Sequence, residues 1–158
     1  MTKKILVINQ EKCSGCRMCE IVCSYFNENE FNPALSRIQV ISDKSKSIDF
    51  TIVCQQCEKA LCQEVCISGA IYYDATIGAY KIDEKKCIGC KLCIISCPVG
   101  AMGFNTKNGV AMKCNLCDGE PKCVKYCFME AIEFIEPEKV SIKKKIITVE
   151  KFLLSQKT

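Results

Sequence analysis

The sixteen cysteines are the residues with the clearest capacity for chemistry, and they fall into four groups of four. Groups I and III have the spacing C-x2-C-x2-C-x3-C; group II widens the second gap to four residues and group IV widens it to five. In chain order they are Cys13, Cys16, Cys19 and Cys23 (group I); Cys54, Cys57, Cys62 and Cys66 (group II); Cys87, Cys90, Cys93 and Cys97 (group III); and Cys114, Cys117, Cys123 and Cys127 (group IV). Four near-copies of one pattern indicate four sites of one kind.

This spacing predicts iron–sulfur chemistry. Three cysteines at i, i+3 and i+6 do not share one face of a regular helix, but they suit a loop that wraps three corners of a 4Fe–4S cubane. Gly15 and Gly89 each precede the second cysteine of their group and permit the tight backbone that such a loop needs. The fourth cysteine of such a run typically ligates the other cluster of a pair. We therefore predict four 4Fe–4S clusters with all sixteen cysteines as ligands.

Two other cysteine-rich classes fit the sequence less well. A disulfide scaffold needs an oxidising compartment, and the N-terminal segment offers only the apolar run 5–8, which is too short for a signal peptide. Structural zinc sites use two CxxC or CxxH pairs separated by a dozen or more residues, whereas three residues separate the third and fourth cysteines here. Histidine is absent, which excludes His-ligated centres.

The charge and the apolar runs limit the partners and the location. The formal charge of +4 counts the cysteines as neutral. Because each Fe4S4 core held by four thiolates adds about −2, the loaded chain carries a charge of about −4, and no nucleic-acid partner is expected. No stretch approaches the about 20 apolar residues of a membrane span, so we expect no membrane span and a soluble, cytoplasmic protein.

The segments around the cysteine groups also repeat. Strand-like runs precede the groups at 5–13, 48–54, 80–87 and 110–114, and others follow the last cysteine at 66–74, 97–105 and 127–135. Each unit therefore predicts a strand, a cysteine loop, a brief helical turn carrying the fourth cysteine, and a second strand. Group I departs from the repeat, since 24–36 reads as a polar loop before a strand at 37–41. We expect Tyr72, Tyr73, Tyr80 and Phe104 in the core.

The four-group pattern resembles the 16-Cys polyferredoxin subunits that serve large oxidoreductases, over residues 3–136. Two segments, CSGCRMCEIVCSYFNENEFNPALSRIQV (13–40) and KCNLCDGEPKCVKYC (113–127), are similar to the compact branch that accompanies tungsten- or molybdenum-dependent aldehyde oxidoreductases, benzoyl-CoA reductases, formate dehydrogenases, hydrogenases and carbon monoxide dehydrogenases. Where that family reads CxHCExPxC, group II has Gln56 at the His position and Ala60 at the Pro position. Gln56 can still donate a hydrogen bond.

The resemblance implies an α+β fold of two bacterial-type dicluster ferredoxin modules, one nested within the other. The first module comprises 1–47 with 108–136, the second is 48–107, and the tail 137–158 is a candidate docking segment. Spacing alone leaves open whether group III pairs with group II or with group IV. The resemblance implies four ligand sets: Cys13, Cys16, Cys19 and Cys127 (cluster one); Cys114, Cys117, Cys123 and Cys23 (cluster two); Cys54, Cys57, Cys62 and Cys97 (cluster three); and Cys87, Cys90, Cys93 and Cys66 (cluster four).

The functional expectation is a one-electron relay without substrate chemistry. No nucleotide-binding loop and no pterin or flavin site is recognisable, and sixteen ligating thiols leave no cysteine as a nucleophile. The resemblance implies a large catalytic oxidoreductase subunit, with the tungsten/molybdenum-pterin aldehyde oxidoreductase type favoured, and a ferredoxin or flavoprotein as the external redox partner. The alternatives are a relay for a hydrogenase, formate dehydrogenase or carbon monoxide dehydrogenase, and a free polyferredoxin that stores electrons.

Overall fold

The computed structural model describes residues 3–43, 45 and 48–142 and contains small sheets and short helices. The strands are β1 (Ile5–Ile8), β2 (Ile38–Asp43), β3 (Ile48–Val53), β4 (Ile71–Asp74), β5 (Ala79–Ile82), β6 (Gly103–Asn105), β7 (Val110–Met112) and β8 (Ile132–Ile135). The helices are α1 (Met18–Glu28), α2 (Leu61–Glu64), α3 (Leu92–Ile95) and α4 (Lys122–Lys125), with 3-10 turns η1 (Pro33–Leu35) and η2 (Leu116–Gly119). The protein is α+β, as predicted. Of the candidate docking tail, 137–142 is helical and 143–158 lies outside the described residues.

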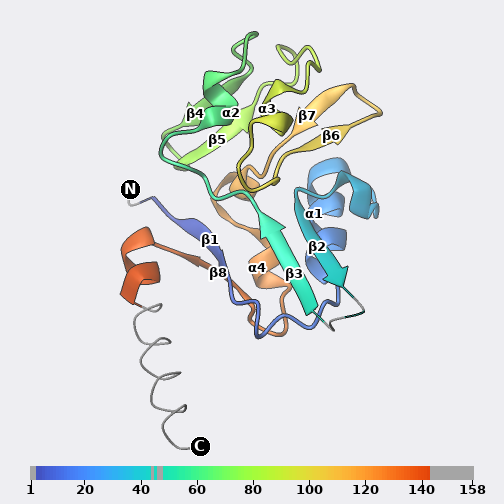
Figure 1. Cartoon of the computed structure of the whole chain (residues 1–158), viewed down its shortest axis with the longest axis vertical. Helices are drawn as coiled ribbons and strands as arrows, with labels where there is room; N and C mark the ends of the chain where they lie inside the picture. The colour runs from blue at the N-terminus through green and yellow to red at the C-terminus, as the bar shows by residue number, and fades with distance from the viewer. Residues whose placement is uncertain (1–2, 44, 46–47, 143–158) are drawn as a thin grey trace, which may run out of the picture.

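The first and last cysteine groups lie side by side because the two ends of the fold pair. Strand β1 runs antiparallel to β8, from Ile5 opposite Ile135 to Ile8 opposite Ile132, and α1 packs against α4. Strand β1 leads into group I and β8 follows group IV, so this pairing brings together two loops that are about a hundred residues apart in the chain (Figure 1).

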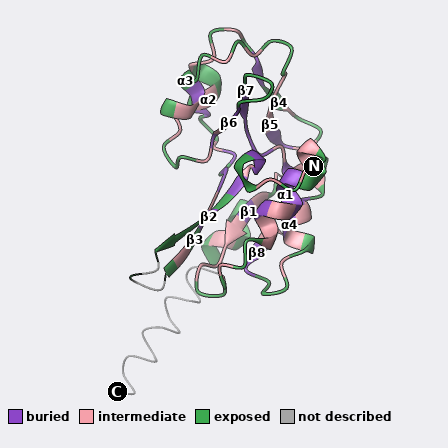
Figure 2. Cartoon of the chain, turned by 90° about the vertical axis from the view of Figure 1, so that its right-hand side faces the viewer, coloured by how far each residue is buried: buried purple, intermediate pink, exposed green. Residues whose placement is uncertain are grey.

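Groups II and III occupy the other half of the fold. Figures 1 and 2 both show α2, α3, β4, β5, β6 and β7 together at one end, with β1, β8, β2, β3, α1 and α4 at the other. Hairpin β4–β5 links group II to group III, while hairpins β2–β3 and β6–β7 connect the two halves. The predicted module boundary 107/108 falls between β6 and β7, and the boundary 47/48 falls immediately before β3. The division into nested modules with those limits stays a prediction.

The short helices differ from the predicted turns, which are expected to carry the fourth cysteine. In groups II, III and IV, they carry the third cysteine instead. Cys62, Cys93 and Cys123 lie within α2, α3 and α4, whereas the fourth cysteine follows two residues after the helix ends. Each helix has four residues and starts just before the third cysteine, so it is complete before the fourth is reached. The third thiol therefore lies on the helix, and the fourth lies beyond its C-terminal end.

Helix α1 occupies part of the segment predicted as a polar loop. It runs to Glu28 and carries both Cys19 and Cys23. The stretch 18–28 contains neither Gly nor Pro, and Val22 and Cys23 are buried, so helical packing outweighs the polar composition. The helix ends at Asn29, which has a left-handed φ of 54° and donates its N–H to Tyr25 O at 2.8 Å.

Two of the four aromatic residues predicted in the core are exposed. The relative exposure is 42% for Tyr72 and 44% for Tyr73, so the prediction is wrong for both. Tyr80 and Phe104 are partly buried. Sheet β4–β5 has only two strands, and the ring of Tyr73 lies against that of Tyr80 at a centroid distance of 5.0 Å. In Figure 2 the loop tips at this end are mostly exposed or intermediate.

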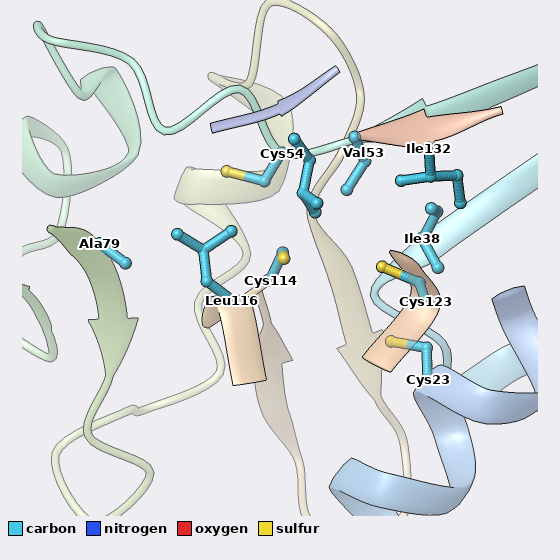
Figure 3. Close-up of a cluster of buried hydrophobic side chains, with 10 residues drawn as sticks. Cys23, Ile38, Val53, Cys54, Ala79, Cys114, Leu116, Cys123 and Ile132 are labelled. Atoms are coloured by element: carbon cyan, nitrogen blue, oxygen red, sulfur yellow. The ribbon is translucent and has the colours of Figure 1, made fainter. Parts of the chain in front are cut away.

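Cysteines form much of the core. The larger buried cluster joins apolar residues from both halves to four thiols: Leu6, Ile38, Val53, Ala79, Leu116 and Ile132, with Cys23, Cys54, Cys114 and Cys123. Figure 3 shows the side chains of Cys23 and Cys123 pointing toward Cys114, and Leu116 lies on the opposite side of Cys114. The smaller buried cluster, Ile71, Cys93, Met102 and Ala111, lies in the half that holds groups II and III. Five of the candidate ligands are therefore part of the buried core.

Candidate metal centres

Each cysteine loop turns through a left-handed residue just before its second cysteine. The φ angles are 65° at Gly15, 48° at Gln56, 69° at Gly89 and 56° at Leu116. The two glycines match the prediction, and at Gly89 an added Cβ would lie 2.4 Å from the carbonyl oxygen of Gly109. At Gln56 and Leu116 the conformation costs roughly 1–2 kcal/mol per residue. Both side chains are almost fully buried, and that burial offsets the cost.

Gln56 connects group II to group IV and to β5. Its Nε2 donates to the carbonyl oxygen of Cys114 at 2.8 Å, and its Oε1 accepts the N–H of Tyr80 at 3.0 Å. Its own N–H donates to Cys54 Sγ at 3.4 Å. The prediction that Gln56 donates a hydrogen bond is confirmed, and the acceptor of its side chain is the main chain of another cysteine loop.

Substitution Gln56→Leu is expected to lower the stability of the loaded protein by roughly 2–6 kcal/mol. The change leaves the Cys114 carbonyl and the Tyr80 N–H buried without partners, and each such group costs about 1–3 kcal/mol. The measurement is the denaturant midpoint of the anoxic holoprotein. Gln55→Leu is the matched control, because Gln55 is exposed and its side chain donates to its near neighbour Val53 O. Equal losses in the two variants would contradict this account.

Two cavities are each lined by four thiols from two different groups. One is lined by Cys23, Cys114, Cys117 and Cys123, together with apolar residues such as Leu6 and Ile38. The other is lined by Cys54, Cys57, Cys62 and Cys97. In both, three thiols come from one group and the fourth comes from its neighbour in space.

Among the remaining cysteines, Cys66, Cys87 and Cys90 lie near Cys93, and Cys13 and Cys16 lie near Cys19. Burial raises the pKa of the Cys93 thiol to about 11, with further contributions from the nearby thiols of Cys87, Cys62, Cys66 and Cys90. Burial, followed by the adjacent Glu20 carboxylate, raises the pKa of Cys19 to about 12, and the thiols of Cys13 and Cys16 add to this effect. Cys127 packs against the same buried cluster as Cys19, and its Sγ accepts the N–H of Ala131 at 3.3 Å.

The donor set fits thiolate-bound clusters. Burial raises the pKa of Cys114 to about 12, so a cationic metal core is needed to compensate its thiolate. Backbone N–H groups point at several sulfurs, from Arg37 to Cys23, Ala101 to Cys97, Ala131 to Cys127 and Ala111 to Cys87, at 3.3–3.5 Å. All sixteen cysteines are described and are free thiols. Within the described chain, no group of three or more cysteine or acidic side chains lies close enough together to hold a single metal ion.

Lys113 is a buried cation that sequence analysis left without a function. Its side chain has a relative exposure of 4%, and its Nζ lies 2.6 Å from Cys54 Sγ. Burial by itself lowers the pKa of the ammonium, but the thiols of Cys54, Cys62 and Cys114 outweigh burial and leave the pKa raised. The available signal was its position directly before the first cysteine of group IV.

The four cysteine groups lie in a row. In addition to burial, the nearby Cys19 thiol of group I raises the pKa of Cys123 in group IV. In the same way, the Cys54 thiol of group II lies close enough to Cys114 of group IV to raise its pKa. The Cys62 thiol of group II likewise lies close to Cys93 of group III and raises its pKa. The order in space is therefore I, IV, II, III. Groups I and III each carry an exposed thiol, at Cys16 and Cys90.

Residues 46–137, which include groups II to IV, match the 4Fe-4S dicluster domain family. The chain belongs to this family. The family is named for a pair of 4Fe–4S clusters, and the sixteen cysteines of this chain provide four ligands for each of four such clusters. Within the described residues, no helix combines the length and the apolar character needed to cross a membrane.

Two relatives and one solved structure resemble the chain over most of its length. It is 37% identical over 122 residues to the polyferredoxin-like subunit of the aliphatic sulfonate oxidoreductase of Pyrococcus furiosus, covering 77% of this chain and 70% of the relative. It is 36% identical over 149 residues to the putative electron transport protein YsaA of Escherichia coli K12, covering 87% and 92%. The active-site complex BamBC of benzoyl-coenzyme A reductase contains a chain with a TM-score of 0.50 and 27% identity, covering 94% and 91%.

Proposed function

We propose that the protein relays single electrons through its four 4Fe–4S clusters between a catalytic subunit and an external redox partner, without substrate chemistry of its own. The row of cysteine groups carries this proposal. Groups IV and II lie in the middle with buried thiols such as Cys114 and Cys54, while groups I and III lie at the ends with Cys16 and Cys90 exposed. In such an arrangement, electrons can enter at the exposed end of one terminal group and leave at the exposed end of the other.

The proposed ligand sets are those that the family resemblance implies. The cavity that Cys23 shares with group IV supports the set for cluster two, and the cavity that Cys97 shares with group II supports the set for cluster three. The influence of Cys66 on Cys93 supports cluster four. By the same reciprocal exchange, Cys127 completes cluster one. In each half of the protein, the fourth cysteine of each loop would thus ligate the cluster that the other loop holds.

The chain's own residues would shape the relay. The clusters supply centres that gain and lose one electron. Burial of the middle thiols excludes water there, and backbone N–H groups that point at sulfur stabilise the more negative, reduced state. The hydrogen bonds of Gln56 hold the group II and group IV loops together at the junction between the two halves.

The partner we favour is a catalytic subunit of the tungsten/molybdenum-pterin aldehyde oxidoreductase type, in the cytoplasm, with a ferredoxin or flavoprotein at the other end. Support comes from the resemblance of 13–40 to such small subunits and from relatives named as parts of an aliphatic sulfonate oxidoreductase and of a benzoyl-coenzyme A reductase complex. A relay for a hydrogenase, formate dehydrogenase or carbon monoxide dehydrogenase is the alternative within the same class. A freely diffusing electron store is the alternative in another class.

Anoxic affinity purification from the native host is expected to yield about 16 iron atoms per chain and a stoichiometric large subunit containing tungsten or molybdenum. Iron, acid-labile sulfide and metal analysis of the eluate provide the measurement. Nickel in the co-purified subunit would redirect the proposal to a hydrogenase or carbon monoxide dehydrogenase. A loaded chain that elutes alone at all salt concentrations would favour the electron store, and a chain without dithionite-reducible clusters would overturn the relay.

A further inference from the structure

Lys113 places a positive charge inside the row of clusters. It follows β7 and directly precedes Cys114, yet its Nζ contacts Cys54, which is 59 positions away in the chain. Its side chain lines the cavity of cluster three, together with the exposed Lys59. The ring centroid of Tyr80 lies 5.8 Å from the ammonium. Lys113 is therefore at the boundary between groups II and IV, in the middle of the row.

Burying this ammonium is costly unless a negative charge compensates it. A buried cation loses its hydration and is retained in proteins chiefly when it is paired. The described residues provide the thiol of Cys54 as its hydrogen-bond acceptor and no carboxylate within ion-pair range. The compensating charge must then come from the nearby thiolates, chiefly those of Cys54 and Cys62, and the cluster they hold.

The strength of this pairing depends on the number of electrons in the cluster. One-electron reduction makes the cluster and its thiolates more negative by one charge, and attraction to a fixed cation grows with that charge. Water screens the interaction little at a buried site, and much more at an exposed lysine such as Lys59. A buried cation therefore favours the reduced form of the adjacent cluster over the reduced forms of more distant ones.

We propose that Lys113 is a potential-setting residue, which holds the added electron preferentially on the cluster of Cys54, Cys57, Cys62 and Cys97. This inference rests on the proposed relay and its ligand sets. The electron comes from a neighbouring cluster or an added reductant, which loses one electron; no bond breaks and no proton moves. The consequence is a relay whose preferred electron position lies in the interior and not at either exposed end.

The test is an EPR-monitored redox titration of the anoxic holoprotein with dithionite, comparing wild type with Lys113→Met. We expect one of the four midpoint potentials to fall by the equivalent of at least a tenfold change in the reduction equilibrium, which is about 59 mV for one electron. Lys113→Arg keeps the charge, and Lys59→Met removes an exposed charge from the same cavity. Both are expected to shift that midpoint by less. Cys62→Ser identifies cluster three, because it must perturb the same midpoint.

The outcomes separate this inference from the relay itself. A wild-type protein without four reducible clusters would overturn the proposed function. Four reducible clusters with no lowered midpoint in Lys113→Met, or with equal shifts for Met and Arg, would overturn the inference alone. If Lys113→Met does not assemble, Lys113→Gln serves as the neutral variant. Assembly of the Arg variant while both neutral variants fail would assign Lys113 to cluster assembly and also overturn the inference.

Discussion

Removal of iron is expected to unfold the protein almost completely. Chelation from the anoxic, reduced chain should abolish most of the far-UV circular dichroism of the holoprotein and the cooperative denaturation transition. The expected loss is the whole free energy of unfolding, roughly 5–15 kcal/mol for a domain of ordinary stability. In small metalloproteins the free energy of metal binding is also the free energy of folding.

The reason lies in how little the secondary structure can hold by itself. Every sheet in the described chain has two strands, and α2, α3 and α4 have four residues each. Two-stranded hairpins are marginal in water, and a single helical turn does not form alone. The larger core includes Cys23, Cys54, Cys114 and Cys123, whose sulfurs face cavities that the clusters would fill.

Reconstitution with iron and sulfide is the control for chelation, and it should restore both the dichroism and the transition. Holoprotein exposed to chelator that is already saturated with iron should remain folded. An iron-free chain that keeps native dichroism and unfolds cooperatively would contradict the account, since the apolar residues alone would then suffice as a core.

The sequence predicted what depends on local pattern. Strands flank cysteine groups in the structure as they do in the repeat, and Gly15 and Gly89 have the left-handed φ that their loops require. The polar composition of 24–36 predicts a loop, but the absence of Gly and Pro before residue 29 allows α1 to extend into this segment. The apolar character of Tyr72 and Tyr73 predicts burial, but a two-stranded hairpin leaves one face open, and both rings are exposed.

What the sequence could not predict depends on contacts between distant segments. Gln56 and Leu116 take the backbone conformation of Gly15 and Gly89 because packing across the junction buries their side chains. Lys113 reads as a surface residue by type, and only its approach to Cys54, 59 positions away, makes it a buried cation. The same limit applied to the pairing of cysteine groups, which spacing left open.

Cys127→Ser is expected to perturb one cluster, and that cluster should be the one held by Cys13, Cys16 and Cys19. A serine oxygen is a weaker ligand for a 4Fe–4S cluster than a thiolate, so the iron content should fall by up to about four atoms per chain while three clusters keep their EPR signals. Strand pairing β1–β8 and the packing of α1 on α4 support this assignment. The reciprocal variant Cys23→Ser should perturb the cluster of group IV, whose cavity Cys23 lines.

Two reference variants assign the signals. Cys16→Ser marks cluster one, and Cys117→Ser marks cluster two, because each is a central ligand of its own group. The proposed partition requires Cys127→Ser to resemble Cys16→Ser and Cys23→Ser to resemble Cys117→Ser. If Cys127→Ser instead reproduces the spectrum of Cys117→Ser, each of these loops keeps its own fourth thiol. The two ends of the chain would then be joined by strand pairing and helix packing alone, without a shared cluster.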